Sequence, residues 1–448
     1  MAKSMTEGRP FRLILQFALP LLVGNLLQQT YNIIDAAIVG RVLGADALAS
    51  VGSTSSVQFM VLGFCIGCCT GFGIPVAKGF GAGRLDRMKH YIFSGAALTG
   101  MVAVVLTALC VFLCPWILRI LSVSEELYGN AYRYLLVIFL GLPFTLLYNL
   151  LASILRAVGD SRTPFVFLVV SAGLNVVLDL LCIVGFGWGC AGAAIATVTS
   201  QAVSGLLCLF FIYKKVSLLH PGRENCRLEG DVSKELLSMG LPMGLQFSIT
   251  AIGSMVMQSA NNGLGSVYVS GFTAALKIKQ FTMCPFDAIA SSVSVFCGQN
   301  LGAGRLDRIR QGVREGLVIA VSYGILAGLI LIFGGRMLSM LFVGGEAAEV
   351  LDAAAKYLRC LGYFFWSLGI LNVLRLSIQG LGYAGRAIFS GVVEMIARST
   401  VSLCFVGAFG FTAICFADQT AWVSACLYLL PVYCLTIRRT AGKLAQKD

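Results

Sequence analysis

The sequence predicts an all-α membrane protein built from two homologous halves. Apolar residues make up 58% of its 448 residues, charged residues only 12%, and the mean hydropathy is +0.86. A water-soluble domain of this size does not have such a composition. The heptapeptide Gly-Ala-Gly-Arg-Leu-Asp-Arg occurs at residues 81–87 and again at 302–308, each time after a long apolar stretch. This identity about half a chain apart indicates an internal duplication.

About twelve apolar stretches are long enough to cross a hydrocarbon core of roughly 30 Å as helices, the structure that satisfies the backbone there. In chain order they are 12–38, 47–73, 90–114, 131–152, 164–186, 190–213, 236–262, 267–297, 313–334, 355–376, 387–409 and 411–436. Six fall in each half, and Pro20 and Pro242, like Asn149 and Asn372, stand at equivalent positions. We therefore expect two six-helix bundles, at residues 1–213 and 235–448, joined by a polar linker at 214–234.

Lys and Arg side chains concentrate on alternate connections, for example at 78–89, 214–234 and 305–314. Cytoplasmic connections of membrane proteins carry such an excess, so both termini and the linker are expected in the cytoplasm of a plasma membrane. The formal net charge of +12 is then mainly a signal of topology, and no nucleic-acid partner is expected. With two histidines, and with most cysteines inside apolar stretches, little material exists for acid–base or metal catalysis. We do not expect an enzyme or a bound cofactor.

Polar residues line one face of the first and fifth predicted helices. In the first helix they are Asn25, Gln28, Gln29, Asn32 and Asp35, at spacings of three and four residues. In the fifth, Ser171, Asn175 and Asp179 repeat every four residues. Such a stripe in a membrane helix faces protein or water, and an acid persists there when it is paired, protonated or functional.

Three segments resemble the multidrug and toxic compound extrusion (MATE) family. They are residues 19–49, which begin with LPLLVGNLLQQTYNIID, residues 155–197, which begin with LRAVGDSRTPF, and residues 299–308, QNLGAGRLDR. The resemblance covers nearly the whole chain. It implies a V-shaped, pseudo-two-fold pair of six-helix lobes that exports organic cations or amphipathic compounds in exchange for H⁺ or Na⁺.

In the branch named after DNA-damage-inducible protein F, an Asp on the first helix and an Asn-x-x-x-Asp on the fifth line a cation site in the N-terminal lobe. By this resemblance the site comprises Gln28, Asp35, Asn149, Asn175, Asp179 and Thr197, with Asn32 beside them, and Na⁺ would bind at Asp35, Asn175 and Asp179. Two carboxylates close together in an apolar pocket cannot easily both stay ionised, so the pair would take up a proton or a cation. The alternative is that Asp35 and Asp179 only hydrogen-bond neighbouring helices.

The second half differs from this plan. Asp35 corresponds to Met257, and Asn175 and Asp179 to Arg398 and Ser402, so a cation site is expected in the first half only. Glu394 and Arg398 are four residues apart on one helix, the spacing of a structural ion pair. Lys277 and Lys279 either line a cavity or extend toward the membrane surface.

A substrate cavity is expected along the seventh and eighth helices. Its predicted members are Gln246, Thr250, Ser254, Met257, Gln258, Lys277 and Gln280. Polar neutral groups beside methionines suit varied apolar ligands, although ordinary helix packing explains the same pattern.

We therefore predict a secondary active multidrug exporter that works as a monomer among membrane lipids. The sequence has no Walker motif, so an ion gradient would drive transport. The first alternative is a flippase of lipid-linked precursors from the same superfamily, and the second is a passive channel or receptor.

Overall fold

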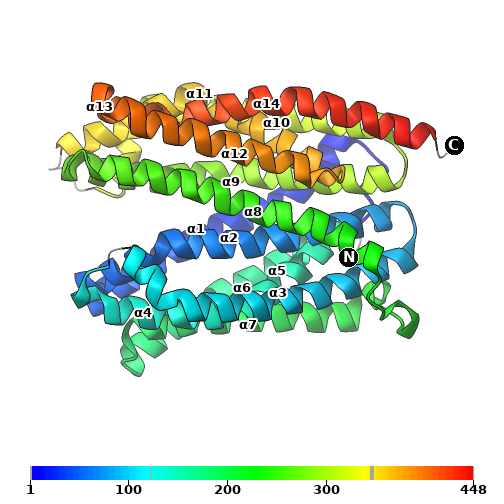
Figure 1. The fold of residues 1–448 in the computed structure, drawn as a ribbon, viewed down its shortest axis with the longest axis horizontal. Coiled ribbons are helices and arrows are strands. Elements are labelled where there is room, and N and C mark those ends of the chain that lie inside the picture. The colour runs from blue at the N-terminus through cyan, green and yellow to red at the C-terminus, as the bar shows by residue number, and fades with distance from the viewer. Residues whose placement is uncertain (1–2, 122, 344–347, 447–448) are drawn as a thin grey trace. The chain divides into compact units, whose positions relative to one another are not determined.

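The computed structural model describes residues 3–121, 123–343 and 348–446, which form helices joined by short turns, without a strand in these ranges (Figure 1). The helices are α1 (Pro10–Leu43), α2 (Ala45–Gly81), α3 (Leu85–Ile120), α4 (Glu125–Leu140), α5 (Leu142–Ala157), α6 (Arg162–Asp179), η1 (Leu180–Gly185), α7 (Gly189–Lys215), η2 (Ser217–Leu219), η3 (Arg223–Asn225), α8 (Gly230–Asn262), α9 (Ser266–Gly302), α10 (Leu306–Ser339), α11 (Ala348–Gly380), α12 (Ala384–Thr400), η4 (Val401–Phe405), α13 (Val406–Phe409) and α14 (Phe411–Ala445). This confirms the predicted fold class.

Within those ranges, eleven helices are long and apolar enough to cross a membrane. The pair α4 and α5 passes the same test jointly, with a bend of 44° between its members, which brings the number to as many as twelve. The predicted span 131–152 covers this bent pair. The chain is thus a multi-pass membrane protein.

Glycines at matching turns show that the two halves repeat in structure as well as in sequence. Four pairs share a positive φ: Gly44 and Gly265 (92° and 106°), Gly83 and Gly304 (66° and 72°), Gly159 and Gly382 (85° and 86°), and Gly187 and Gly410 (66° and 55°). This region of φ is costly for residues with a Cβ atom. In addition, α6 and α12 both continue into a π-helical segment, η1 and η4. A π-helical turn in the same place of both repeats points to inheritance from one ancestral unit.

The repeated heptapeptide forms a tight turn after α2 and after α9. Arg84 N donates to Gly79 O at 3.1 Å, and Arg305 N donates to Asn300 O at 2.9 Å. These bonds reach back five residues and satisfy carbonyl groups at the helix ends, while a glycine supplies the left-handed conformation.

Packing divides the chain into two compact units. Unit 1 comprises Met1–Ser4 and Val23–Gly244, and unit 2 comprises Met5–Leu22 and Leu245–Asp448. These boundaries differ from those predicted by sequence, because α1 and α8 each contribute to both units. The first turns of α1 bury Ile14, Phe17 and Ala18 in the apolar core of unit 2. The first turns of α8 bury Leu236 in the core of unit 1. Both helices pass from one unit to the other just after a proline, Pro20 or Pro242.

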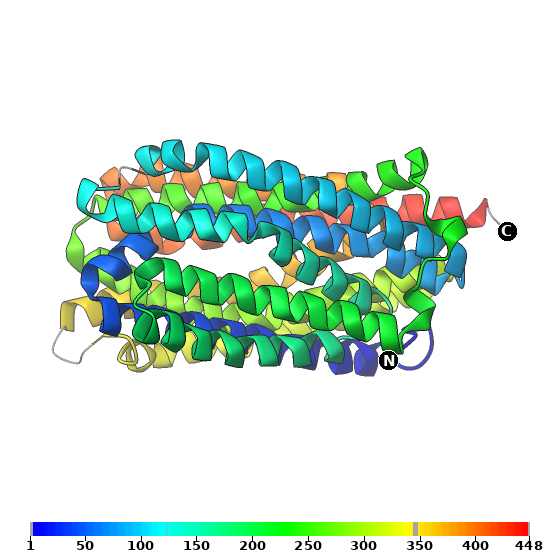
Figure 2. The same cartoon turned by 90° about the horizontal axis from the view of Figure 1, so that it is seen from below.

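Within unit 1, α6 and α7 run side by side (Figure 2), and α7 also packs on α4 and α5. Within unit 2, α11 is central and packs on α9, α10 and α14, while α12 lies along α14 (Figure 1). These contacts bring together the polar faces described next.

Candidate functional site

The polar stripe of α6 is buried against the interior of unit 1. Ser171, Asn175 and Asp179 are only 4%, 3% and 0% exposed, although much of the remaining surface of α6 is exposed. Ser171 Oγ donates to Ser200 O at 3.0 Å, and Asn175 Nδ2 lies 3.5 Å from Thr197 Oγ1. The four-residue spacing thus places one side of α6 on α7, as the helical period requires.

Asp35 of α1 and Asp179 of α6 lie next to each other. The two carboxyl groups are close enough to interact electrostatically. The two residues come from helices far apart in the sequence, and both belong to unit 1. The structure therefore brings together the two acids that the sequence analysis singled out.

Several buried oxygen atoms around this pair accept no hydrogen bond from a donor group in the described part of the chain. They are Asp35 Oδ1, Asn175 Oδ1 and both carboxylate oxygens of Asp179. No Lys, Arg or His among the described residues forms an ion pair with either acid. Leaving such oxygens unpaired is costly. Hard oxygen ligands without a resident counter-charge fit a Na⁺ ion or a proton.

Two tyrosines lie beside the carboxyl pair. Tyr31 is one helical turn before Asp35 and lies near Gln28. Tyr134 of α4 lies near both acids and near Gln58 of α2. The sequence analysis missed Tyr31, Tyr134 and Gln58. One signal was available, since Tyr134 has a repeat partner in Tyr357, 223 positions later.

The other predicted members of the site either form hydrogen bonds of their own or are exposed. Asn149 Nδ2 donates to Thr145 O of its own helix at 2.8 Å. Asn32 is exposed. Thr197 reaches the site through Asn175, and its hydroxyl donates to Ala193 O at 3.1 Å.

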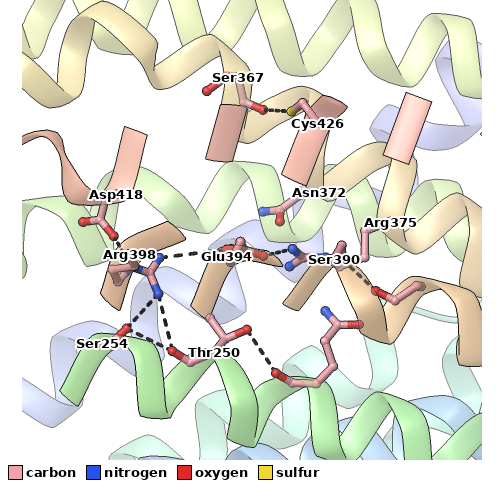
Figure 3. A network of polar contacts seen from close by, with 12 residues as sticks. Thr250, Ser254, Ser367, Asn372, Arg375, Ser390, Glu394, Arg398, Asp418 and Cys426 are labelled. Atoms are coloured by element: carbon pink, nitrogen blue, oxygen red, sulfur yellow. Dashed lines mark hydrogen bonds and ion pairs between the residues drawn. The ribbon is translucent and has the colours of Figure 1, made fainter. Parts of the chain in front are cut away.

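The predicted cavity residues of α8 pack within unit 2. Gln246 is 5% exposed and contacts Gln379 of α11 at 2.6 Å. Thr250 and Ser254 contact Arg398 of α12 (Figure 3). Met257 is 2% exposed in the apolar core. These contacts are of the kind that helix packing makes, and the cavity role of these residues stays a prediction.

The remaining predicted cavity residues have more open surroundings. Gln258 Nε2 donates to Asn262 Oδ1 at 2.9 Å on the same helix. Lys277 and Gln280 of α9 are exposed.

A network of charged and polar side chains lies in the interior of unit 2 (Figure 3). Glu394 lies 3.9 Å from Arg398 and makes a closer ion pair with Arg375. Arg398 Nε is also 3.0 Å from Asp418 Oδ1. The ion pair between Glu394 and Arg398 was expected from the sequence, but the ion pair between Glu394 and Arg375 was not.

Asp418 of α14 has further partners that the sequence analysis missed. It is fully buried and lies 2.5 Å from Lys279 Nζ. Tyr357 Oη donates to it, also at 2.5 Å. Lys279 thus forms an ion pair with Asp418, and its Nζ also lies 5.5 Å from the centre of the Trp422 ring. An Asp inside the apolar stretch 411–436 was the signal available in the sequence.

Comparisons with known proteins show the family of the chain. The family model described as MatE matches residues 20–181 and 242–424, one stretch in each half. The chain belongs to the MatE family.

Members of the MatE family in Bacillus subtilis (strain 168) resemble the chain over most of its length. "Probable multidrug resistance protein YpnP" is 30% identical over 381 residues, which cover 85% of each chain. "Probable multidrug resistance protein YoeA" is 27% identical over 389 residues, 85% of this chain and 83% of the relative. A solved structure described as "Crystal structure of MATE in complex with MaL6" superimposes with a TM-score of 0.92 at 20% identity, covering 98% of each chain. At that identity the match shows the MatE fold alone.

Proposed function

We propose that this MatE protein is a secondary active exporter that moves organic cations or amphipathic drugs out of the cell in exchange for H⁺ or Na⁺. The observation that carries the proposal is the Asp35–Asp179 pair, with its unpaired buried oxygens and, among the described residues, no base that forms an ion pair with it. A transporter couples two fluxes when one site changes its charge on binding an ion. This pair is suited to that role, because both acids cannot easily stay ionised in an apolar interior.

Asp35 and Asp179 take up the coupling ion, and Asn175 supplies a further oxygen ligand. Thr197 orients Asn175, and Gln28 orients Tyr31 beside Asp35. Asn32 and Asn149 belong to the polar lining of the ion's path. Each elementary charge that moves down a potential of 100 mV releases about 2.3 kcal/mol, which is enough to drive substrate accumulation outside the cell.

The substrate side of the proposal rests on α8 and α9. Lys277, Gln280 and Gln258 provide polar contacts for an amphipathic substrate. Gln246, Thr250, Ser254 and Met257 support this surface from behind through the packing of α8. The protein functions as a monomer in the plasma membrane. Both of its termini lie in the cytoplasm, which the distribution of Lys and Arg supports.

Ethidium efflux tests the proposal. Cells that lack their own pumps express the native protein or Asp35→Asn, and efflux is followed with and without Na⁺ and with a protonophore. We expect gradient-dependent efflux from the native protein and its loss in Asp35→Asn. Asp46→Asn, the same change at an exposed position at the start of α2, is the matched control and should export normally.

Three outcomes would contradict the proposal. Efflux that survives Asp35→Asn with its full ion dependence would remove the coupling role from this pair. If the native protein reaches the membrane but exports no ethidium, a flippase of lipid-linked precursors or a narrow-substrate exporter becomes the better interpretation. Efflux without any gradient would indicate a passive channel.

A further inference from the structure

The charged network of unit 2 occupies the repeat equivalent of the cation site in unit 1. Arg398 stands 223 positions after Asn175, and Tyr357 stands 223 positions after Tyr134. The turn glycines Gly159 and Gly382 have the same separation and nearly the same φ. The correspondence therefore holds in the backbone as well as in the alignment of the two halves.

The same pair of helices makes the central contact in each unit. In unit 1, Asn175 of α6 faces Thr197 of α7. In unit 2, Arg398 of α12 faces Asp418 of α14, the helices that correspond to α6 and α7 in the repeat. The tyrosine next to the acids in unit 1 also has its counterpart here, because Tyr357 donates to Asp418.

The charges, however, differ between the units. In unit 1 two acids lie together with no base paired to them among the described residues. In unit 2 each acid of the network has basic partners: Asp418 has Lys279 and Arg398, and Glu394 has Arg375 and Arg398.

Three of the described residues that carry or can carry a charge contact Asp418. Lys279 approaches from α9, Tyr357 from α11 and Arg398 from α12. A further acid of unit 2, Asp287 of α9, lies outside this network and has no ion pair among the described residues; it accepts a hydrogen bond from Asn372 Nδ2 at 3.2 Å. Buried acids with such partners have their counter-charge supplied by the protein itself.

We propose that Arg398 and Lys279 take, in unit 2, the place that the coupling ion takes in unit 1. Unit 2 then contains a cation site that is permanently filled by side chains. The acids of unit 1 then bind the coupling ion, and the network around Asp418 and Glu394 keeps a constant charge through the transport cycle. The inference deepens the proposed function and rests on it, since it assumes that unit 1 binds the coupling ion.

The same geometry shows how the site could be reopened. Arg398→Asn installs the residue found at the equivalent position of unit 1. It removes one base, so Asp418 keeps Lys279 as its basic partner and Glu394 keeps Arg375. The uncompensated acid should then take up Na⁺ or a proton, as the acids of unit 1 are proposed to do.

The test measures ion binding by thermal unfolding of purified full-length protein in detergent. Asp35→Asn/Asp179→Asn serves as the background, so that unit 1 contributes nothing. The unfolding midpoint is followed during a Na⁺ titration at constant ionic strength, with a bulky organic cation as replacement, and during a pH titration without Na⁺. We expect the Na⁺ response of the native protein to vanish in the background.

In this background, Arg398→Asn should restore a midpoint that rises with added Na⁺ or with falling pH. Arg398→Lys keeps the charge and should give no such response. Adding Asp418→Asn to Arg398→Asn removes the unpaired acid and should abolish the restored response. A merely structural role for Arg398 would lower every midpoint without creating an ion dependence. If Arg398→Asn does not fold, Lys279→Met makes the same test.

Two results would overturn the inference. The first is a Na⁺ response that persists in the background with unit 2 unchanged, because unit 2 would then bind the ion itself. The second is a folded Arg398→Asn or Lys279→Met variant with no gain of response to Na⁺ or pH. Failure of the proposed function would give a different result. The unfolding midpoint of the native protein would then show no response to Na⁺ or pH that depends on Asp35.

Discussion

Gly159 and Gly382 have nearly the same left-handed backbone, with φ of 85° and 86°, but very different surroundings. A Cβ atom on Gly382 would meet nothing within 4 Å, whereas one on Gly159 would lie 1.9 Å from Lys3 O. The amide of Lys3 also donates to Val158 O at 2.9 Å, so the N-terminal segment lies directly on this turn. The repeat conserves the backbone of the turn, and the N-terminal segment covers only its first copy.

Alanine at the two glycines should therefore have unequal effects. Gly382→Ala costs only the left-handed conformation, about 1–2 kcal/mol. Gly159→Ala costs the same and also displaces the segment at Lys3, so its unfolding midpoint should fall further. Thermal unfolding of the two purified variants measures the difference, and faster proteolysis near the N-terminus should accompany Gly159→Ala alone. Equal midpoints and equal proteolysis would contradict the described contact.

The crossing of α10 and α11 depends on the absence of side chains at Gly328 and Gly362. A Cβ atom at Gly328 would lie 2.5 Å from Gly362 O, a backbone atom that cannot move alone. Small residues let membrane helices approach in this way. Gly328→Ala should destabilise the protein by about 1–3 kcal/mol. Gly334→Ala on the same helix, where nothing lies within 4 Å, should be nearly neutral in the same unfolding assay.

Buried and exposed ion pairs should differ strongly in their contribution to stability. Glu394 is buried between Arg375 and Arg398, so Glu394→Gln leaves buried bases with less counter-charge and should cost about 3–5 kcal/mol. Glu235 bonds Lys78 at 2.9 Å, but their side chains are 27% and 44% exposed. Glu235→Gln should cost no more than about 1 kcal/mol. The unfolding midpoints of the two variants decide this, and a larger loss for Glu235→Gln would be inconsistent with the burial.

Asp160 caps the first turn of α6. Its carboxylate accepts hydrogen bonds from Thr163 N at 3.0 Å, Thr163 Oγ1 at 2.7 Å and Arg162 N at 3.1 Å. Burial alone would raise the pKa of this carboxyl, but the hydrogen bonds that it accepts hold the pKa below its usual value. Asp160→Ala should cost about 1 kcal/mol near neutral pH.

The pH dependence of this effect has a definite sign. A carboxyl group whose pKa is lower in the folded state stabilises the protein above its unfolded pKa, and the contribution is lost as the pH falls through the folded pKa. The stability difference between native protein and Asp160→Ala should therefore shrink on acidification. Ser161→Ala is the control, because the Ser161 side chain makes no capping hydrogen bond. A difference that grows in acid would contradict the prediction.

Asp35 and Asp179 should behave as one functional group in transport. If the proposed function holds, removing either carboxyl abolishes the shared uptake of an ion. Asp35→Asn/Asp179→Asn should then lose no more efflux than either single variant. The measurement is ethidium efflux from the three variants at equal expression. Additive losses would indicate two independent roles.

Much of the fold could be predicted without coordinates. The number of spans and the duplication follow from hydropathy and from repeated residues, which are properties of neighbouring positions along the chain. The burial of Ser171, Asn175 and Asp179 on one side of α6 follows from the helical period. For the same reason Asp35 could be identified as an acid that needs a special environment inside an apolar helix.

Only the tertiary structure decided which side chains meet. Lys279 pairs with Asp418 rather than lining an open surface, and Arg375 shares Glu394 with Arg398. Tyr134 lies beside the acids of unit 1. The first turns of α1 belong to unit 2, and the first turns of α8 belong to unit 1. The physical reason is that these contacts depend on how each helix is rotated about its axis and where it crosses its neighbours. Periodicity identifies the polar face of a helix, but the partner of that face is set by the packing of the whole bundle.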